Sequence, residues 1–571
     1  AERTLPRMGV RRTLAALRVI NQPGGFDCPG CAWPEAAPDE RHRIEFCESG
    51  AKAVAEEATR ARVDPDFFAR HSIASLRSRS DFWLGEAGRL TSPMIKRSGG
   101  THYEPLGWDE AFTEIARRLR ELDDPDQAVF YTSGRTSNEA AFLYQLLVRS
   151  FGTNNLPDCS NMCHEPTSFA LGRSIGIGKG SVQMDDFPLA DLILVVGQNP
   201  GSNHPRMLTT LERAKRGGTR IIAINPLPEA GLIRYKNPQT IRGIVGHGTE
   251  LADIHLPVRL GGDHALFQLW NRRLVADSSA GQGFIDREFV AEHTSGFEAL
   301  ARHLSTLDEG ALLSATGLTA AQVDEAYAMI AGSRRLIICW AMGITQHVGA
   351  VDTIDEMTNL ALLGGHIGRP GAGLCPIRGH SNVQGDRTMG IAEHPPAGLL
   401  DALEAEFGVP MPREAGLDTL EAVRALGDGR ARILVGLGGN FVRATPDTGP
   451  TEQALAGARL TVQISTKLNR SHTVCGDTAI ILPTLGRTDL DHGRGGTQFV
   501  TVEDSMSIVH TSTGRLAPPS AELSSETTII CDLARALLGD HHVVSWALLR
   551  DDNDRVRDHI AAVVPGFHDF N

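Results

Sequence analysis

The feature that most constrains the fold is an apolar segment followed by a glycine turn, a helical segment and a second apolar segment. Residues 190–196 read ADLILVV, and Gly197–Gly201 supply the turn. Residues 205–216 should form a helix, and residues 219–224 read TRIIAI. A strand that is apolar throughout is buried on both faces, which is typical of a parallel sheet covered by helices. This pattern predicts a doubly wound α/β fold.

The same pattern recurs along the chain. Strand-like segments at residues 335–340, 432–435 and 479–482 each lead into a glycine or proline turn, and an earlier strand is expected at 128–131. Backbone N–H groups and helix N-termini at such turns can bind phosphates, so the recurrence suggests several nucleotide sites. Helices are predicted at residues 50–62, 108–122 and 138–151, a helical insertion at 401–426 and a loop at 511–525, while residues 1–25 are basic and show no clear pattern.

Composition narrows the class of protein. The chain has 571 residues with 56 Lys and Arg against 69 Asp and Glu, a formal net charge of −13. This charge argues against nucleic acid as the main partner, because phosphate binding needs a concentrated basic surface. The sequence holds no apolar run of about 18 residues, so no membrane insertion is predicted. Arg11-Arg12 lies too close to Cys28 for a twin-arginine signal, and we expect a cytoplasmic protein.

Three of the nine cysteines fall within the first 47 residues, as Cys28-Pro29-Gly30-Cys31 followed by Cys47. Two thiolates separated by two residues can converge on iron or zinc, and the short spacing favours an iron–sulfur cluster. A zinc knuckle or unrelated buried thiols are the alternatives. No fourth cysteine lies nearby. The side chains that could replace it are Asp27, Glu35, Asp39 and His42, and the alternative is an incomplete or absent cluster.

A second candidate is the pair Cys163-His164. A thiolate is a soft ligand for a metal centre, and a neighbouring histidine, whose ordinary pKa lies near neutrality, can accept a proton from a substrate. Alone, such a dipeptide is more often structural. Cys159, four residues earlier, is interpreted as a packing residue.

The third candidate is Arg378, in a stretch that also holds Gly373, Gly379 and Gly385. Glycines at this density let the backbone approach another group closely. An arginine there could bind a small carboxylate or oxyanion through two parallel hydrogen bonds. The alternative is an ordinary arginine in a surface loop.

Together these segments resemble the molybdopterin-dependent oxidoreductases, in their formate dehydrogenase H-like branch, and come close to the acid-resistance-associated oxidoreductases of that branch. The resemblance runs from about Phe26 to about Asp540. Its most specific segments are Asn154–Ser168, Gly197–Pro200 with His204-Pro205, Gly343–Gln346 and Arg378–Gly385.

The resemblance implies a role for each candidate. Cys163 would bind molybdenum or tungsten, His164 would accept the proton, and Arg378 would orient the substrate. A [4Fe-4S] cluster would be held by Cys28, Cys31 and Cys47. Two molybdopterin guanine dinucleotides would hold the metal and would meet Gly134, Arg135, Asn199, Asn225, Pro226, Gly261, Asp263, Met342, Gly343, Gln346, Gly438, Asn440 and Gln463.

The resemblance also implies a domain order. Residues 1–97 would be an N-terminal Fe–S region, and residues 98–158 the first part of one α/β lobe. Residues 159–380 would form a second lobe that carries Cys163. Residues 381–571 would complete the first lobe and return to the Fe–S region.

The chain departs from the family's pattern in three ways. The third of four cluster cysteines is missing. Ser49 stands where a lysine commonly lies between cluster and pterin, with Lys52 as a substitute. The β-barrel-like domain that usually covers the cofactor is expected to be absent, because the sequence stops at Asn571.

The implied activity is the two-electron oxidation of formate, or of a similar small anion, to carbon dioxide. Electrons would pass through the cluster to an acceptor protein or subunit. One alternative is reduction of nitrate or another oxyanion by the same kind of site, although such relatives usually lack the adjacent histidine. The other is a cofactor-binding stress or assembly protein without catalysis, which the missing cysteine would favour.

Overall fold

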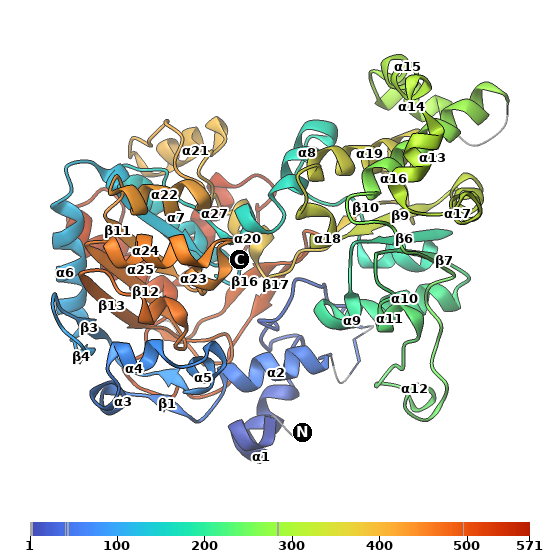
Figure 1. Ribbon diagram of the computed structural model, residues 1–571. Coiled ribbons are helices and arrows are strands. Elements are labelled where there is room, and N and C mark those ends of the chain that lie inside the picture. Colours follow the sequence, from blue (N-terminus) through green and yellow to red (C-terminus); the bar gives the residue numbers. More distant parts are fainter. Residues whose placement is uncertain (1–3, 40, 43–44, 282–284, 495) are drawn as a thin grey trace.

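The computed structural model describes residues 4–39, 41–42, 45–281, 285–494 and 496–571. Two lobes stand side by side, each built on its own sheet, and the N-terminal helices lie at the lower edge between them (Figure 1). The fold is mixed α/β, as the apolar strands and glycine turns predicted. In the described part of the chain, no helix has the length and apolarity needed to cross a membrane.

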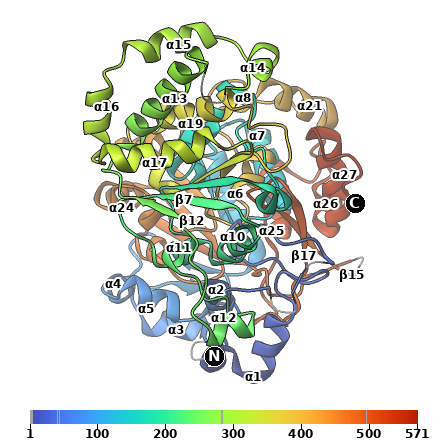
Figure 2. The same cartoon turned by 90° about the vertical axis from the view of Figure 1, so that its right-hand side faces the viewer.

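The second lobe carries a sheet of five parallel strands. Side chains that alternate along β6 enter two different apolar clusters. Leu192 and Leu194 pack in one, whereas Ile193 and Val195 pack in the other. Both faces are therefore covered by helices, with α13, α17 and α19 on one side and α10 and α11 on the other (Figure 2). The strand order is β10 (Gly373–Pro376), β9 (Leu336–Trp340), β6 (Leu192–Val196), β7 (Arg220–Ile224), β8 (Ile254–Leu256), and the helices are α10 (Pro205–Arg216), α11 (Ala230–Ile233), α13 (Asp263–Ser279), α17 (Ala320–Ala331) and α19 (Ala350–Leu363).

The first lobe is assembled from two distant parts of the chain. Its β5 pairs in parallel with β11, so that Phe130 lies opposite Val435. Residues 98–158 therefore share a sheet with residues 381–480 and do not form a domain by themselves. The order is β4 (Glu104–Pro105), β3 (Met94–Lys96), β13 (Thr478–Pro483), β12 (Leu460–Ser465), β11 (Ile433–Leu437), β5 (Ala128–Thr132), and β3 is antiparallel to both of its neighbours, β13 and β4.

Most predicted helices are found close to their expected bounds. The helical insertion consists of two helices. Their bounds are α2 (Glu48–Glu57), α6 (Trp108–Arg120), α7 (Asn138–Phe151), α21 (Ala397–Phe407) and α22 (Thr419–Asp428).

Residues 1–25, in which the sequence shows no clear pattern, contain a helix in the structure. A helix, α1 (Thr4–Leu17), forms there, with a kink at Gly9, where φ is 70°. Met8 and Ala16 are fully buried in an apolar cluster that also contains Cys28 and residues of α2. This helix is stabilised by tertiary packing rather than by local propensity, which explains why the sequence pattern alone did not show it.

Candidate functional site between the lobes

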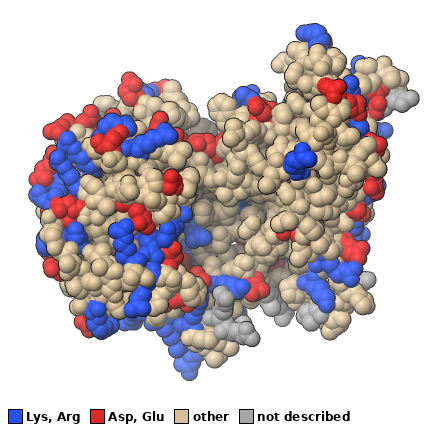
Figure 3. Space-filling model, in the orientation of Figure 1, with Lys and Arg blue, Asp and Glu red and all other residues tan. Residues whose placement is uncertain are grey.

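Two cavities open between the lobes, where the carboxyl ends of the parallel strands of each sheet point, and the space-filling view shows the hollow (Figure 3). Each has a volume of about 680 Å³. The first is lined by the turns after β6, β9 and β10 together with the N-terminal cysteines. The second is lined by the turns after β5, β11, β12 and β13. The two cavities adjoin, because both are lined by Ala53, Arg135, Cys159, His380 and Ala444.

Glycine is required where the turns pack tightly. The N–H of Gly343 donates to the carbonyl of Gly197 over 3.0 Å, and a Cβ added at Gly343 would lie 2.4 Å from that oxygen. A Cβ added at Gly134 would lie 2.6 Å from Cys159 Sγ. These turns can hold no side chain at those positions, and the backbone of Gly197 and Gly343 forms part of the first cavity's wall.

The predicted cofactor-binding residues separate into two groups. Asn199, Met342 and Gly343 line the first cavity, Gly438 and Asn440 the second, and Arg135 both. The others line neither cavity: Gly134, which is buried against Cys159, and Asn225, Pro226, Gly261, Asp263, Gln346 and Gln463. The contacts of all of them with a cofactor stay a prediction.

Cys163 lies in the wall of the first cavity and is 6% exposed. Its backbone carbonyl accepts hydrogen bonds from Thr345 Oγ1 at 2.6 Å and from Gln346 Nε2 at 3.3 Å. Gln346 therefore fixes the Cys163 loop, and Thr345, which the sequence analysis missed, acts with it. Burial raises the pKa of the Cys163 thiol, while the charge of Arg378 opposes this shift.

His164 and Arg378 lie together behind Cys163, although they are distant in the sequence. Arg378 Nη1 donates to the His164 carbonyl at 3.3 Å, and Nη2 donates to the Gly178 carbonyl at 2.7 Å. Both residues are buried, so Arg378 is not a surface-loop residue. Neither Arg378 Nε nor His164 Nε2 has a hydrogen-bond partner. These two atoms are buried and unpartnered, and neither His164 nor Arg378 lines either cavity, so a ligand's access to them stays a prediction.

The expectation that His164 titrates near neutrality is wrong for this environment. Burial and the neighbouring Arg378 cation lower the pKa of His164 well below its ordinary value, because both disfavour a second positive charge. Its Nδ1 lies 3.2 Å from Thr167 Oγ1. The imidazole is thus neutral at physiological pH.

Two of the three N-terminal thiols, those of Cys28 and Cys47, lie close to Gly50. The Gly50 N–H lies 3.3 Å from Cys47 Sγ, and a Cβ at Gly50 would lie 2.9 Å from Cys28 Sγ. Cys28, Cys31 and Cys47 all line the first cavity. Within the described residues, no three Cys, His, Asp or Glu side chains are grouped as ligands of one metal ion. Since the thiolates of a cluster bind separate irons, the three thiols need not meet at one point, and a cluster held by them stays a prediction.

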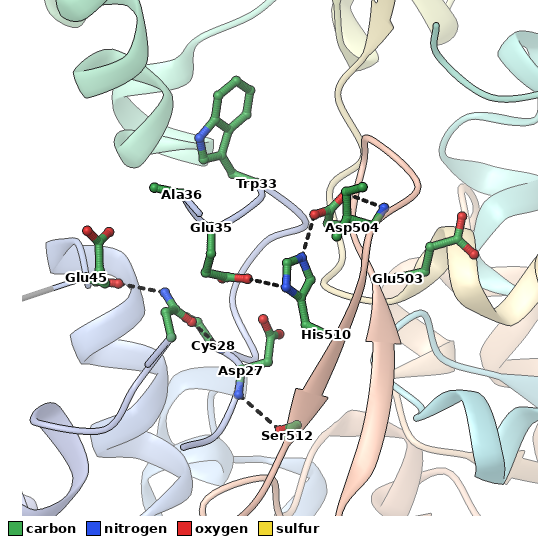
Figure 4. A network of polar contacts seen from close by, with 12 residues as sticks. Asp27, Cys28, Trp33, Glu35, Ala36, Glu45, Glu503, Asp504, His510 and Ser512 are labelled. Carbon is green, nitrogen blue, oxygen red and sulfur yellow. Dashed lines mark hydrogen bonds and ion pairs between the residues drawn. The ribbon is translucent and has the colours of Figure 1, made fainter. Parts of the chain in front are cut away.

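None of the four side chains suggested as a further cluster ligand lines the cavity with the thiols. Asp27 forms an ion pair with Arg487 at 2.8 Å. Glu35 pairs with Arg206 at 3.1 Å and with His510 at 3.0 Å, and His510 in turn contacts Asp504 (Figure 4). The other two, Asp39 and His42, are exposed.

Lys52, suggested as a substitute for the missing lysine, is paired elsewhere in this structure, and that role stays a prediction. Its ammonium pairs with Glu48 at 2.6 Å, one helical turn away, and its side chain is 38% exposed. Lys52 lines neither cavity.

A buried carboxyl group lies near the Cys159–Cys163 loop. Asp386 is fully buried, and neither of its carboxyl oxygens has a hydrogen-bond partner. Burial, and then the negative charge of Asp158, raise the pKa of Asp386 well above its ordinary value. The folded protein therefore holds this side chain in its neutral form.

This geometry predicts a pH-dependent effect of Asp386→Asn. A carboxyl whose pKa is raised by folding contributes stability below its unfolded pKa of about 3.9, and this contribution is lost as the pH rises through the folded pKa. We expect Asp386→Asn to raise the free energy of unfolding by about 1 to 3 kcal/mol at pH 8, and by less at pH 5. Denaturant unfolding at the two pH values measures this, with the exposed Asp401→Asn as control. An effect equal at both pH values would contradict the assignment.

With the geometry established, the chain can be placed among known proteins. The family model described as "Molybdopterin oxidoreductase" matches residues 89–484. This match covers more than half of the chain, and the chain belongs to the molybdopterin oxidoreductase family. The family implies a molybdenum– or tungsten–pterin cofactor.

Three individual proteins show how similar this chain is to its relatives. An uncharacterised oxidoreductase of Mycobacterium tuberculosis is 58% identical over 571 residues, which cover 100% of this chain and 73% of that protein. Protein YdeP of Escherichia coli K12 is 46% identical, with 99% of this chain and 75% of YdeP covered. Formate dehydrogenase H of the same organism is 33% identical over 307 residues, 53% of this chain and 40% of that protein.

A solved structure supports the fold. Acetylene Hydratase from Pelobacter acetylenicus superposes with a TM-score of 0.61 at 17% identity, covering 82% of this chain and 63% of that one. At this identity the likeness concerns the fold alone.

Proposed function

We propose that this protein is a formate dehydrogenase-like oxidoreductase that removes two electrons from formate or a similarly small anion. The observation that carries the proposal is the set of groups around Cys163. The Cys163 thiol faces the cavity, while His164 Nε2 and Arg378 Nε lie buried beside it without partners. A neutral base and a fixed cation suit a substrate that is anionic and loses a proton.

The two cavities support the proposal of a cofactor that consists of two nucleotide-containing units. Two adjoining spaces of equal volume, one on each lobe, suit two molybdopterin guanine dinucleotides that share one molybdenum or tungsten. When bound, this group would accept the two electrons of the reaction. The metal would be held through Cys163, the nucleotides by the glycine turns, and a [4Fe-4S] cluster by Cys28, Cys31 and Cys47.

The protein's own residues would have distinct tasks. Arg378 favours the thiolate form of Cys163 through its charge and can offset the desolvation of an anion. His164 is neutral and can accept the proton at Nε2, since Nδ1 faces the Thr167 hydroxyl. Thr345 and Gln346 hold the loop that presents Cys163. An electron-acceptor protein or subunit would complete the reaction.

The direct test is elemental analysis of the purified protein together with a formate-dependent dye-reduction assay. Molybdenum or tungsten with iron, and dye reduction that requires formate, are the expected results. Nitrate-dependent oxidation of a reduced dye without formate activity would favour the oxyanion reductase, because Arg378 suits that anion as well. A metal-loaded protein inactive in both assays would favour a non-catalytic role.

The role of Arg378 predicts that Arg378→Lys impairs turnover although the positive charge is kept. Lysine cannot reproduce at once the Nη donors that bind the His164 and Gly178 carbonyls and the unpartnered Nε, so we expect kcat/KM for formate to fall about tenfold to a hundredfold. Steady-state kinetics measure the change, with the exposed Arg413→Lys as control and the melting temperature as a check on folding. An unchanged kcat/KM would remove Arg378 from substrate binding.

A further inference from the structure

The guanidinium of Arg206 joins the second lobe to the N-terminal cysteine segment. Arg206 lies in the first turn of α10 and is 12% exposed. Its Nη2 donates to the Trp33 carbonyl at 2.5 Å and to Glu35 Oε1 at 3.1 Å, and its Nη1 lies 3.9 Å from Glu45 Oε2. All three acceptors fall between Cys31 and Cys47. Arg206, a residue of the second lobe, is thus anchored within the cysteine segment.

Arg206 lines the first cavity together with Cys28, Cys31 and Cys47. The thiols and this cation lie close enough to interact electrostatically, and Cys31 is the cysteine that contributes most. Thiolates that bind a metal add negative charge to a buried space, where attraction to a nearby cation is much stronger than in water.

The position of the guanidinium is fixed from behind. Glu35, which accepts from Arg206, is itself held by His510 Nδ1 at 3.0 Å, and His510 Nε2 contacts Asp504 Oδ2 at 2.6 Å (Figure 4). Glu35, His510 and Asp504 are all nearly buried side chains. This chain of contacts keeps Glu35 away from the thiols and holds Arg206 beside them.

We propose that Arg206 is the counter-ion of the three-cysteine site, and that it sets the reduction potential of the cluster bound there. The proposal rests on the proposed function, since it assumes a cluster at Cys28, Cys31 and Cys47. Arg206 is a positioning residue because it acts through the thiolates and their irons. Removal of a fixed positive charge makes the addition of an electron less favourable.

The test compares Arg206→Met and Arg206→Lys in the metal-loaded protein. Arg216→Met is the matched control, because Arg216 lies on the same helix, is about half exposed, pairs with Glu212 and does not line the first cavity. We expect Arg206→Met to lower the equilibrium constant for cluster reduction at least tenfold, which is about 59 mV for one electron. Arg206→Lys should recover most of the change. A redox titration followed by electron paramagnetic resonance measures the potential, and iron analysis measures occupancy.

Wild-type potential and iron content in Arg206→Met would overturn the proposal. A second measurement uses the metal-free protein and does not depend on the cluster. The rate at which iodoacetamide alkylates Cys31 at fixed pH should fall severalfold in Arg206→Met and recover in Arg206→Lys, because alkylation requires the thiolate. If the wild-type protein binds no iron, the proposed cluster fails, and the alkylation rates alone decide whether Arg206 stabilises these thiolates. Equal rates in all variants would exclude it.

Discussion

Replacing Cys163 by alanine is expected to abolish formate oxidation while leaving the fold intact. Cys163 is the thiol that faces the first cavity beside His164 and Arg378, so its loss removes the metal's protein ligand in the proposed mechanism. Its side chain borders a cavity rather than a packed core, and truncation should cost less than about 2 kcal/mol of unfolding free energy. Dye-reduction rates and denaturant unfolding of the purified variant measure the two effects.

The matched control is Cys531→Ala. Cys531 is fully buried in the apolar core of the first lobe, so its truncation should lower stability and keep activity. The two cysteines are thus expected to show opposite effects. If Cys163→Ala instead lost stability and kept its rate, Cys163 would be a packing residue and the proposed function would lose its main support.

The second large effect is on stability. Arg89 and Asp489 form an ion pair at 2.7 Å in which both side chains are fully buried. The Arg89 guanidinium also donates to the carbonyls of Glu57, Thr466 and Thr484, and so joins α2 to two loops at the edge of the sheet. Arg89→Met removes this donor from the Asp489 carboxylate and from the three carbonyls, and leaves Asp489 with the Gly486 N–H at 2.9 Å and with Arg12 at 3.8 Å. We expect a loss of about 3 to 5 kcal/mol in unfolding free energy.

Denaturant unfolding tests this expectation, with Arg97→Met as control. Arg97 pairs with Glu104 and Glu110 at the surface, where an ion pair contributes about 1 kcal/mol or less. The double variant Arg89→Met, Asp489→Asn should lose less than the sum of the two single variants, because the uncompensated charge is gone. Strict additivity would show that the pair does not act as a unit.

Several parts of this protein could be predicted from local sequence. The apolar strands determine a buried parallel sheet, because a strand without polar positions has no face to turn to water. The glycine turns after these strands predicted where cavities open. The resemblance in the segments around Cys163 and Arg378 predicted that these residues meet, and they do so through the His164 backbone.

Other features of the protein could be recognised only in the tertiary structure. The helix α1 forms because Met8 and Ala16 meet α2 and Cys28, and its own sequence carries no sufficient signal. The neutral state of His164 is also tertiary, since burial and Arg378 determine its pKa.

The surroundings of the cysteines show most clearly what could not be predicted from the sequence alone. Sequence alone determined that Cys28, Cys31 and Cys47 can act together, because their spacing is local. It left Glu35 as one of four possible further ligands and Lys52 as a substitute for the missing lysine. Only the fold decided that Glu35 is held by Arg206 and His510, that Lys52 turns to Glu48, and that Arg206 is the cation beside the thiols. The reason is physical: the partner of a buried charge is selected by proximity in space, and residues 35, 206 and 510 come together only when both lobes and the N-terminal segment have packed.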